Sequence, residues 1–170
     1  MRIANLFLAL PILLASCGGS SDPAELTKSG EIALGSKDSA SAAESFDSAL
    51  SSIGGDTSHP MFMRAKLGLA EAIAKSDPKK SQGILAELQK ALPGKLSAKD
   101  FIRVMNQMAE SSAEDAITVT AETLKTALAS FPAAKVQLDA VGQYLAKKAA
   151  AAGNEEGANA MAGLGYTGGD

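Results

Sequence analysis

The 170-residue chain has little of the chemistry that enzymes and cofactor proteins use. It contains no tryptophan, one histidine and one cysteine, and aromatic residues make up 4% of it. The histidine, His59, precedes Pro60 and has no cysteine or histidine partner at metal-ligand spacing. We therefore interpret His59 as a cap or loop residue, and the lack of tryptophan argues against a pocket that stacks sugars or bases.

Motifs for catalysis and phosphate binding are also missing. The serines lack the Gly-x-Ser-x-Gly pattern of a nucleophile, and no phosphate-binding glycine loop occurs. We therefore expect no enzymatic activity, no cofactor and no metal, and we nominate no catalytic residue. The acidic residues Glu110, Glu114 and Asp115 gather around a predicted helix start, where they offset the positive end of the helix dipole. A divalent-ion site there is the alternative.

The charge of the chain is mildly acidic and scattered. The formal net charge is −3, and no run of basic residues occurs. We therefore do not expect the protein to bind nucleic acid. Lys79 and Lys80 fall in the first turn of a predicted helix, where positive charge is disfavoured. We interpret them as part of a solvated face, and a contact for an acidic partner is the alternative.

The first seventeen residues read MRIANLFLALPILLASC. Arg2 and the amino terminus give a short positive region, and Leu6 to Ala15 form an apolar stretch of ten residues. A helix needs roughly 20 apolar residues to span a bilayer core, so this stretch is too short for a permanent anchor. The pattern predicts a secretory signal peptide.

The end of this segment, Leu14-Ala15-Ser16-Cys17, resembles the lipobox of bacterial lipoproteins at every position. The resemblance implies that residues 1–16 are cleaved off and that Cys17 receives a thioether-linked diacylglycerol, with a further acyl chain such as palmitate usually added to its new amino group. Two or three acyl chains hold a protein to a membrane far more firmly than one. An ordinary secreted protein with a chance cysteine is the alternative.

A lipidated Cys17 leaves no thiol for a disulfide, so the mature domain must fold by core packing alone. Gly18 follows Cys17, whereas an aspartate at that position commonly retains Gram-negative lipoproteins of this type in the inner membrane. We therefore expect the outer membrane, facing the periplasm, rather than the inner membrane. Residues 17–21 comprise the lipidated cysteine and a flexible tether.

The pattern of residues 22–165 predicts an all-α domain of helical hairpins. Helices begin near residues 23, 39, 60, 78, 98, 113, 133 and 155, each with apolar residues at three- and four-residue spacing. The stripe of the seventh helix contains Val136, Val141, Tyr144 and Leu145. Start signals are Asp22-Pro23, Asp38, Asp77-Pro78, Asn154 and the pairs Ser97 with Asp100 and Ser112 with Asp115. No segment alternates as a strand does.

The helical hairpins recur with a period in the upper thirties, which points to an α-solenoid. The first unit resembles a tetratricopeptide repeat. It places Gly30, Ala42, Phe46 and Ala49 at the spacing where that family carries small residues and one aromatic. The resemblance implies that small residues let two helices approach closely while Phe46 fills the space between neighbouring hairpins. A non-repetitive helical bundle is the alternative.

These observations together predict a lipid-anchored cell-envelope protein whose helical-repeat domain is a scaffold for protein–protein interaction. A partner protein or peptide would bind in the groove of the repeats. Binding of a small ligand or glycan by an envelope lipoprotein is the alternative, and a structural spacer is a third. Residues 166–170 form a glycine-rich tail that we expect to fray. A docking peptide anchored by Tyr166 is the alternative for the tail.

Overall fold

The computed structural model describes residues 22–168, and this part of the chain is all-α, as predicted. It contains eight α-helices and one 3₁₀ helix, with no strand among the described residues. The helices are α1 (Pro23–Gly35), α2 (Ser39–Ile53), α3 (Phe62–Ile73), α4 (Pro78–Ala91), α5 (Ala98–Ala109), α6 (Ala116–Ser130), η1 (Pro132–Ala134), α7 (Lys135–Ala151) and α8 (Glu155–Gly163). The predicted signal peptide 1–16, Cys17 and the tether to residue 21 lie outside the described residues.

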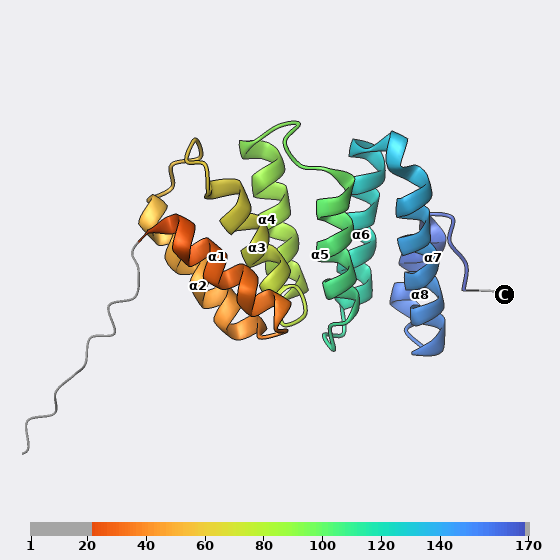
Figure 1. Cartoon of the computed structure of the whole chain (residues 1–170). Helices are drawn as coiled ribbons and strands as arrows, with labels where there is room; N and C mark the ends of the chain where they lie inside the picture. Colours follow the sequence, from red (N-terminus) through yellow and green to blue (C-terminus); the bar gives the residue numbers. More distant parts are fainter. Residues whose placement is uncertain (1–21, 169–170) are drawn as a thin grey trace, which may run out of the picture.

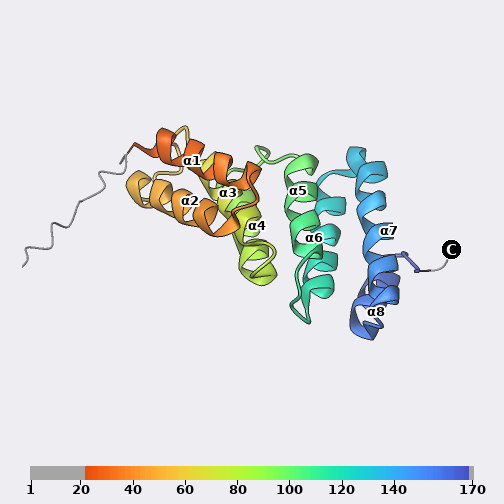
Figure 2. The same ribbon diagram turned by 60° about the horizontal axis from the view of Figure 1, so that its bottom comes forward.

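Consecutive helices pair into four hairpins that stand in a row (Figure 1). The odd-numbered helices form one layer, in which α1 contacts α3, α3 contacts α5 and α5 contacts α7. In the second layer α4 contacts α6 and α6 contacts α8, while α2 packs against α3 of the next hairpin. Figure 2 shows the same row from another side, so the molecule is an open stack rather than a closed bundle.

Side-chain caps start four of the helices as the sequence predicts. The carboxylate or amide oxygen of each cap residue accepts a backbone N–H at 2.8–3.1 Å, in Asp22, Asp38, Asp77 and Asn154. Ser97 and Asp100 form the predicted capping box at the start of α5. At the other end of α2, Gly54 adopts a left-handed φ of 65°, a conformation that glycine takes without steric cost. These local signals fix the hairpin turns.

The start of α6 differs from the prediction. Ser112 and Asp115 form no capping box, and the helix begins at Ala116, with Asp115 as an N-cap that makes no side-chain cap hydrogen bond. Instead the hydroxyl oxygen of Ser111 accepts the N–H of Ala113 at 3.1 Å. A serine that satisfies a nearby backbone amide offers the chain an alternative to helix, which explains the later start.

His59 is a turn residue, one of the two roles that the sequence analysis allows, and the N-cap of α3 is Met61. The Nδ1 atom of His59 accepts the backbone N–H of Met61 at 3.1 Å. The side chain therefore stabilises the turn before α3, which begins at Phe62 rather than at Pro60.

The buried face of α7 also differs from the prediction. Leu138, Val141 and Leu145 are buried, whereas Val136 is 82% exposed and Tyr144 is 44% exposed. Val136 lies only two residues from Leu138, which places it on the opposite side of the helix. Periodicity alone identified the helix but assigned two of its residues to the wrong face.

The close packing of the first two hairpins depends on Phe46. Its ring is fully buried, and it lies between two glycines, Gly30 of α1 and Gly68 of α3. A Cβ atom built on Gly30 would lie 2.8 Å from the ring, and one on Gly68 would lie 2.4 Å from it. Real Cβ contacts are longer than this, so only glycine fits at either position. Ala42 and Ala49 on α2 are likewise fully buried.

Residues 164–168, which follow α8, lie against α7. We call this segment the strap; the sequence analysis assigns its last three residues to the glycine-rich tail. The backbone N–H of Tyr166 donates to the carbonyl of Met161 at 3.0 Å, and the ring of Tyr166 covers Gly142. As far as Gly168 the tail is therefore packed onto the domain rather than frayed.

None of the helices within residues 22–168 combines the length and the apolar character that crossing a membrane requires.

The slot around Phe46 predicts a specific effect of adding one methyl group. Gly68→Ala places a Cβ inside the contact distance of the ring, and overpacking of this kind should destabilise the domain by about 1–3 kcal/mol. Gly83→Ala on α4 is the matched control, because nothing lies within 4 Å of its Cβ position. The control should stabilise by about 0.5–1 kcal/mol through helix propensity. Urea unfolding followed by circular dichroism measures both, and equal effects would contradict the packing argument.

Candidate interaction groove

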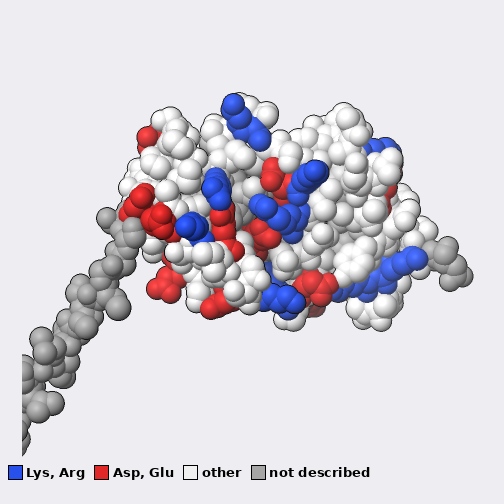
Figure 3. Space-filling view, in the orientation of Figure 1, with Lys and Arg blue, Asp and Glu red and all other residues white. Residues whose placement is uncertain are grey.

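A groove of about 560 Å³ lies between α1 and α3 and extends to α5. Its floor includes the buried Phe46 and Gly68, and its apolar wall includes Leu34, Met63 and Leu67. Charged residues complete the lining: Glu31, Arg64, Glu71 and Arg103. Figure 3 shows acidic and basic side chains interspersed over the side of the molecule on which α1, α5 and α7 lie. The groove therefore combines an apolar floor with a rim of both charges.

The first ion pair of this rim connects α1 to α3. Arg64 uses Nε and Nη2 to contact both carboxylate oxygens of Glu31, a two-point arrangement that fixes the orientation of both side chains. The hydrogen bond from Arg64 to Glu31 raises the pKa of Arg64. The side chain of Arg64 is 58% exposed and that of Glu31 is 36% exposed, so water screens the pair and it contributes little to stability. Its main effect is to set the shape of the rim.

The second ion pair connects α3 to α5. The Nε atom of Arg103 lies 2.7 Å from a carboxylate oxygen of Glu71, whose side chain is only 15% exposed. Burial raises the pKa of Glu71, the charge of Arg103 partly opposes that rise, and nearby Asp100 adds to it. Glu71 is therefore a poorly hydrated carboxylate in the wall of the groove, with a cation on one side.

A third cluster connects the end of α5 to α7. The hydroxyl of Tyr144 donates to Glu110 at 2.5 Å, and the ammonium of Lys148 donates to the same oxygen at 3.1 Å. The hydrogen bond from Tyr144, followed by that from Lys148, lowers the pKa of Glu110. The hydrogen bond to Glu110 raises the pKa of Tyr144. Glu110 is the C-cap of α5, so it does not sit at a helix start as the sequence analysis expected.

These three clusters share one geometry along the odd-numbered layer. An acidic residue of one odd helix or its cap meets a basic residue of the next odd helix, in the pairs Glu31 with Arg64, Glu71 with Arg103 and Glu110 with Lys148. The three glutamates stand forty and thirty-nine residues apart, close to the period of the hairpins. Sequence reasoning missed this series, although the recurrence of glutamate at the repeat period was a visible signal.

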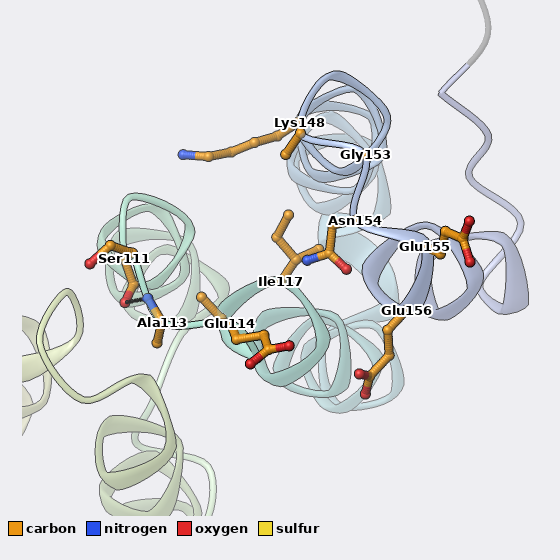
Figure 4. A pocket seen from close by; sticks show the side chains of 12 residues that line it. Ser111, Ala113, Glu114, Ile117, Lys148, Gly153, Asn154, Glu155 and Glu156 are labelled. Carbon is orange, nitrogen blue, oxygen red and sulfur yellow. Dashed lines mark hydrogen bonds between the residues drawn. The ribbon is translucent and has the colours of Figure 1, made fainter.

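A second cavity, also of about 560 Å³, lies between the α5–α6 loop and the start of α8. Its charged residues include Glu114, Lys148 and Glu156, which lie on different sides of it and do not converge (Figure 4). The side-chain oxygen of Asn154 is already bonded to the N–H of Gly157 at 2.8 Å. The arrangement thus offers no common point for an ion or a reacting atom.

The remaining sequence-predicted residues are widely separated from one another. Lys79 and Lys80 are exposed in the first turn of α4. Glu114 lines the second cavity, whereas Glu110 bonds to α7 residues, so the predicted acidic group is divided. Within residues 22–168 no group of three or more histidine, cysteine or acidic residues is placed to hold a metal ion.

The position of Glu71 predicts a pH dependence of stability. Because its pKa is raised in the folded state, its stabilising contribution is present below the unfolded pKa and is lost as pH rises through the folded pKa. Glu71→Gln removes this loss, so the free energy of unfolding of the variant, relative to the original chain, should increase between about pH 4 and about pH 7. Urea unfolding at both pH values measures the difference.

A second variant tests the cause. Arg103 lowers the pKa of Glu71, so Arg103→Gln should raise that pKa further and make stability fall more steeply with pH. A difference between Glu71→Gln and the original chain that is constant with pH would contradict the assignment.

Comparison with protein-family models, with curated proteins and with solved structures gave no match to this chain. Any function must therefore be argued from the groove and from the sequence itself.

Proposed function

We propose that this chain is a lipid-anchored protein of the bacterial cell envelope, and that its helical-hairpin domain is a scaffold that binds a partner protein. The observation that carries the proposal is the open groove between α1 and α3. An apolar floor between paired helices is the kind of surface on which a partner helix or an extended peptide buries apolar side chains.

The lining of the groove favours a macromolecular partner. Leu34, Met63 and Leu67 give it an apolar wall, and a methionine adapts readily to different bound shapes. The charged residues of the rim are paired with one another across the helices. Such paired charges give a partner direction and register.

The anchor supports the location in this proposal. Cys17 ends a segment that resembles a lipobox, and α1 begins only a few residues later, at Pro23. A short tether would hold the domain close to the membrane, so its partner would be a protein that can be reached from that surface. Gly18 after the lipidated position favours the outer membrane, facing the periplasm.

The lipid anchor is tested by one substitution and one control. Cys17→Ser should abolish incorporation of a palmitate analogue, because the thioether needs the thiol. Ser16→Ala keeps the lipobox pattern and should leave labelling unchanged. Labelling in a bacterial host, read after immunoprecipitation, distinguishes the two, and unchanged labelling of the Cys17 variant would refute the lipoprotein interpretation.

The groove is tested by charge placed on its apolar wall. Met63→Asp should reduce partner recovery by roughly tenfold or more, because truncated or charged hot-spot positions cost about 2 kcal/mol or more. Val136→Asp is the matched control, since Val136 is 82% exposed on α7. The measurement is stoichiometric capture from gently solubilised membranes, followed by mass spectrometry.

Three outcomes of this capture are informative. A partner that the Val136 variant retains and the Met63 variant loses supports the groove. A partner that both variants retain places binding elsewhere on the domain. Recovery of no stoichiometric protein contradicts the scaffold proposal.

A further inference from the structure

Three basic side chains surround the loop between α4 and α5. Lys90 lies in the last turn of α4, Lys95 in the loop and Lys99 in the first turn of α5, and all three are exposed. We call these residues the lysine cluster. Among residues 22–168 no acidic side chain forms a salt bridge with any of them. The cluster therefore presents three unpaired positive charges around one loop.

The nearest acidic side chains are held by their own turns. The carboxylate of Asp100 accepts the backbone N–H and the hydroxyl of Ser97 at 2.9 and 2.7 Å. In the α2–α3 loop, Asp56 accepts the N–H and the hydroxyl of Ser58 at 2.9 and 2.6 Å. The hydrogen bonds from Ser58 lower the pKa of Asp56. Neither carboxylate is paired with a lysine of the cluster.

The lysine cluster shares one edge of the molecule with the start of α1. In Figure 2 the first turn of α1, the α2–α3 loop, the α4–α5 loop and η1 follow one another along the upper edge. Figure 3 shows basic side chains projecting from the upper edge above α4. At the start of α1, Asp22 and Glu25 complement the positive end of the helix dipole. We call this side of the molecule the loop edge.

The loop edge also contains the most exposed of the large apolar side chains in the described part of the chain. Val136 is 82% exposed and lies in the first turn of α7, shortly after η1. The Cα–Cβ bond of a helical residue tilts toward the helix N-terminus, so this side chain leans toward the loop edge. Its neighbour Lys135 is paired with Asp139 at 2.6 Å. An exposed apolar side chain near lysines suits the boundary between lipid headgroups and acyl chains.

The proposed lipid anchor limits the distance between this edge and a membrane. Cys17 precedes Pro23 by six residues, and six fully extended residues span about 20 Å. The start of α1 is therefore kept near the bilayer, and the loop edge with it. Anionic lipids attract lysines that come close to the membrane surface.

We propose that the loop edge docks onto the membrane that holds the lipid anchor. The lysine cluster contacts the phosphates of anionic lipids, and Val136 contacts the boundary of the acyl chains. This inference rests on the lipid anchor of the proposed function. Acyl chains and a basic cluster together hold a protein to a membrane more firmly than a single acyl chain does. Docking also fixes the orientation of the domain, with the α3–α4 turn facing away from the bilayer.

The test uses the full lipidated chain in vesicles of phosphatidylethanolamine and phosphatidylglycerol. Pro93→Cys adds a thiol to the α4–α5 loop, and Ser76→Cys adds one to the α3–α4 turn, both at exposed positions. Cys17 is the only cysteine of the chain, so each variant has one free thiol for a fluorophore when Cys17 is lipidated. A nitroxide on the lipid headgroup should quench the label at residue 93 roughly threefold more than the label at residue 76, because α4 separates the two positions by about 20 Å.

Charge removal tests the cause of the docking. Replacing the lysine cluster by glutamine should abolish most of the difference in quenching between the two labels, and so should vesicles of phosphatidylcholine, which carry no net charge. The matched control replaces three exposed lysines near the start of α4 by glutamine: Lys75, Lys79 and Lys80. The control removes the same charge and should leave the difference unchanged.

Several results would overturn the proposal. Equal quenching of the two labels contradicts docking, and equal effects of the two triple variants contradict the role of the lysine cluster. A label at residue 93 that is shielded only when envelope proteins are added would identify an acidic protein as the occupant and would also overturn the proposal. Attachment of two fluorophores to each variant would show a free Cys17, which refutes the lipid anchor of the proposed function and the docking with it.

Discussion

The close approach of α1 and α3 around a single aromatic ring is the constraint on which the first half of the structure depends. Phe46 from α2 lies between Gly30 and Gly68, and neither glycine tolerates a side chain. The same ring and Gly68 also form part of the floor of the groove. The spacing that packs the core thus sets the depth of the surface that we propose binds a partner.

The charged residues of the odd-numbered layer contribute less to the stability of the fold than this buried packing does. Each of the three clusters joins an odd helix to the next one, and in each cluster one of the two ion-paired side chains is more than half exposed. Exposed ion pairs add little stability. Glu71 is the exception, because its burial makes its ionisation unfavourable in spite of Arg103. Its ionised form therefore carries a cost in stability that the exposed pairs do not.

The sequence predicted local structure well because its signals are local. Caps at Asp38, Asp77 and Asn154 and the turn at His59 depend on residues two or three positions away. The small residues Gly30, Ala42 and Ala49 correctly predicted the close packing of the first hairpin. The prediction failed before α6, where Ser111 and Ser112 are both able to accept a backbone N–H. Hydrophobic periodicity does not show which of the two serines does so, and in the structure it is Ser111.

Contacts between distant residues were less accessible to sequence reasoning. The partners of Glu31, Glu71 and Glu110 lie more than thirty residues away, and their register depends on how the hairpins stack. The packing of Tyr166 against Gly142 joins residues that are twenty-four positions apart in the chain. Neither of these contacts follows from helix periodicity, although the glutamates recur at the repeat spacing. The groove could not be predicted from the sequence, because residues from four helices line it.

The row of hairpins has a mechanical consequence. In a stack of this kind each unit is held chiefly by its neighbours in sequence, and among the described residues α1 and α2 do not pack against α7 and α8. Tension applied between the ends would therefore be borne in series, and hairpins would detach one after another while the others stayed folded.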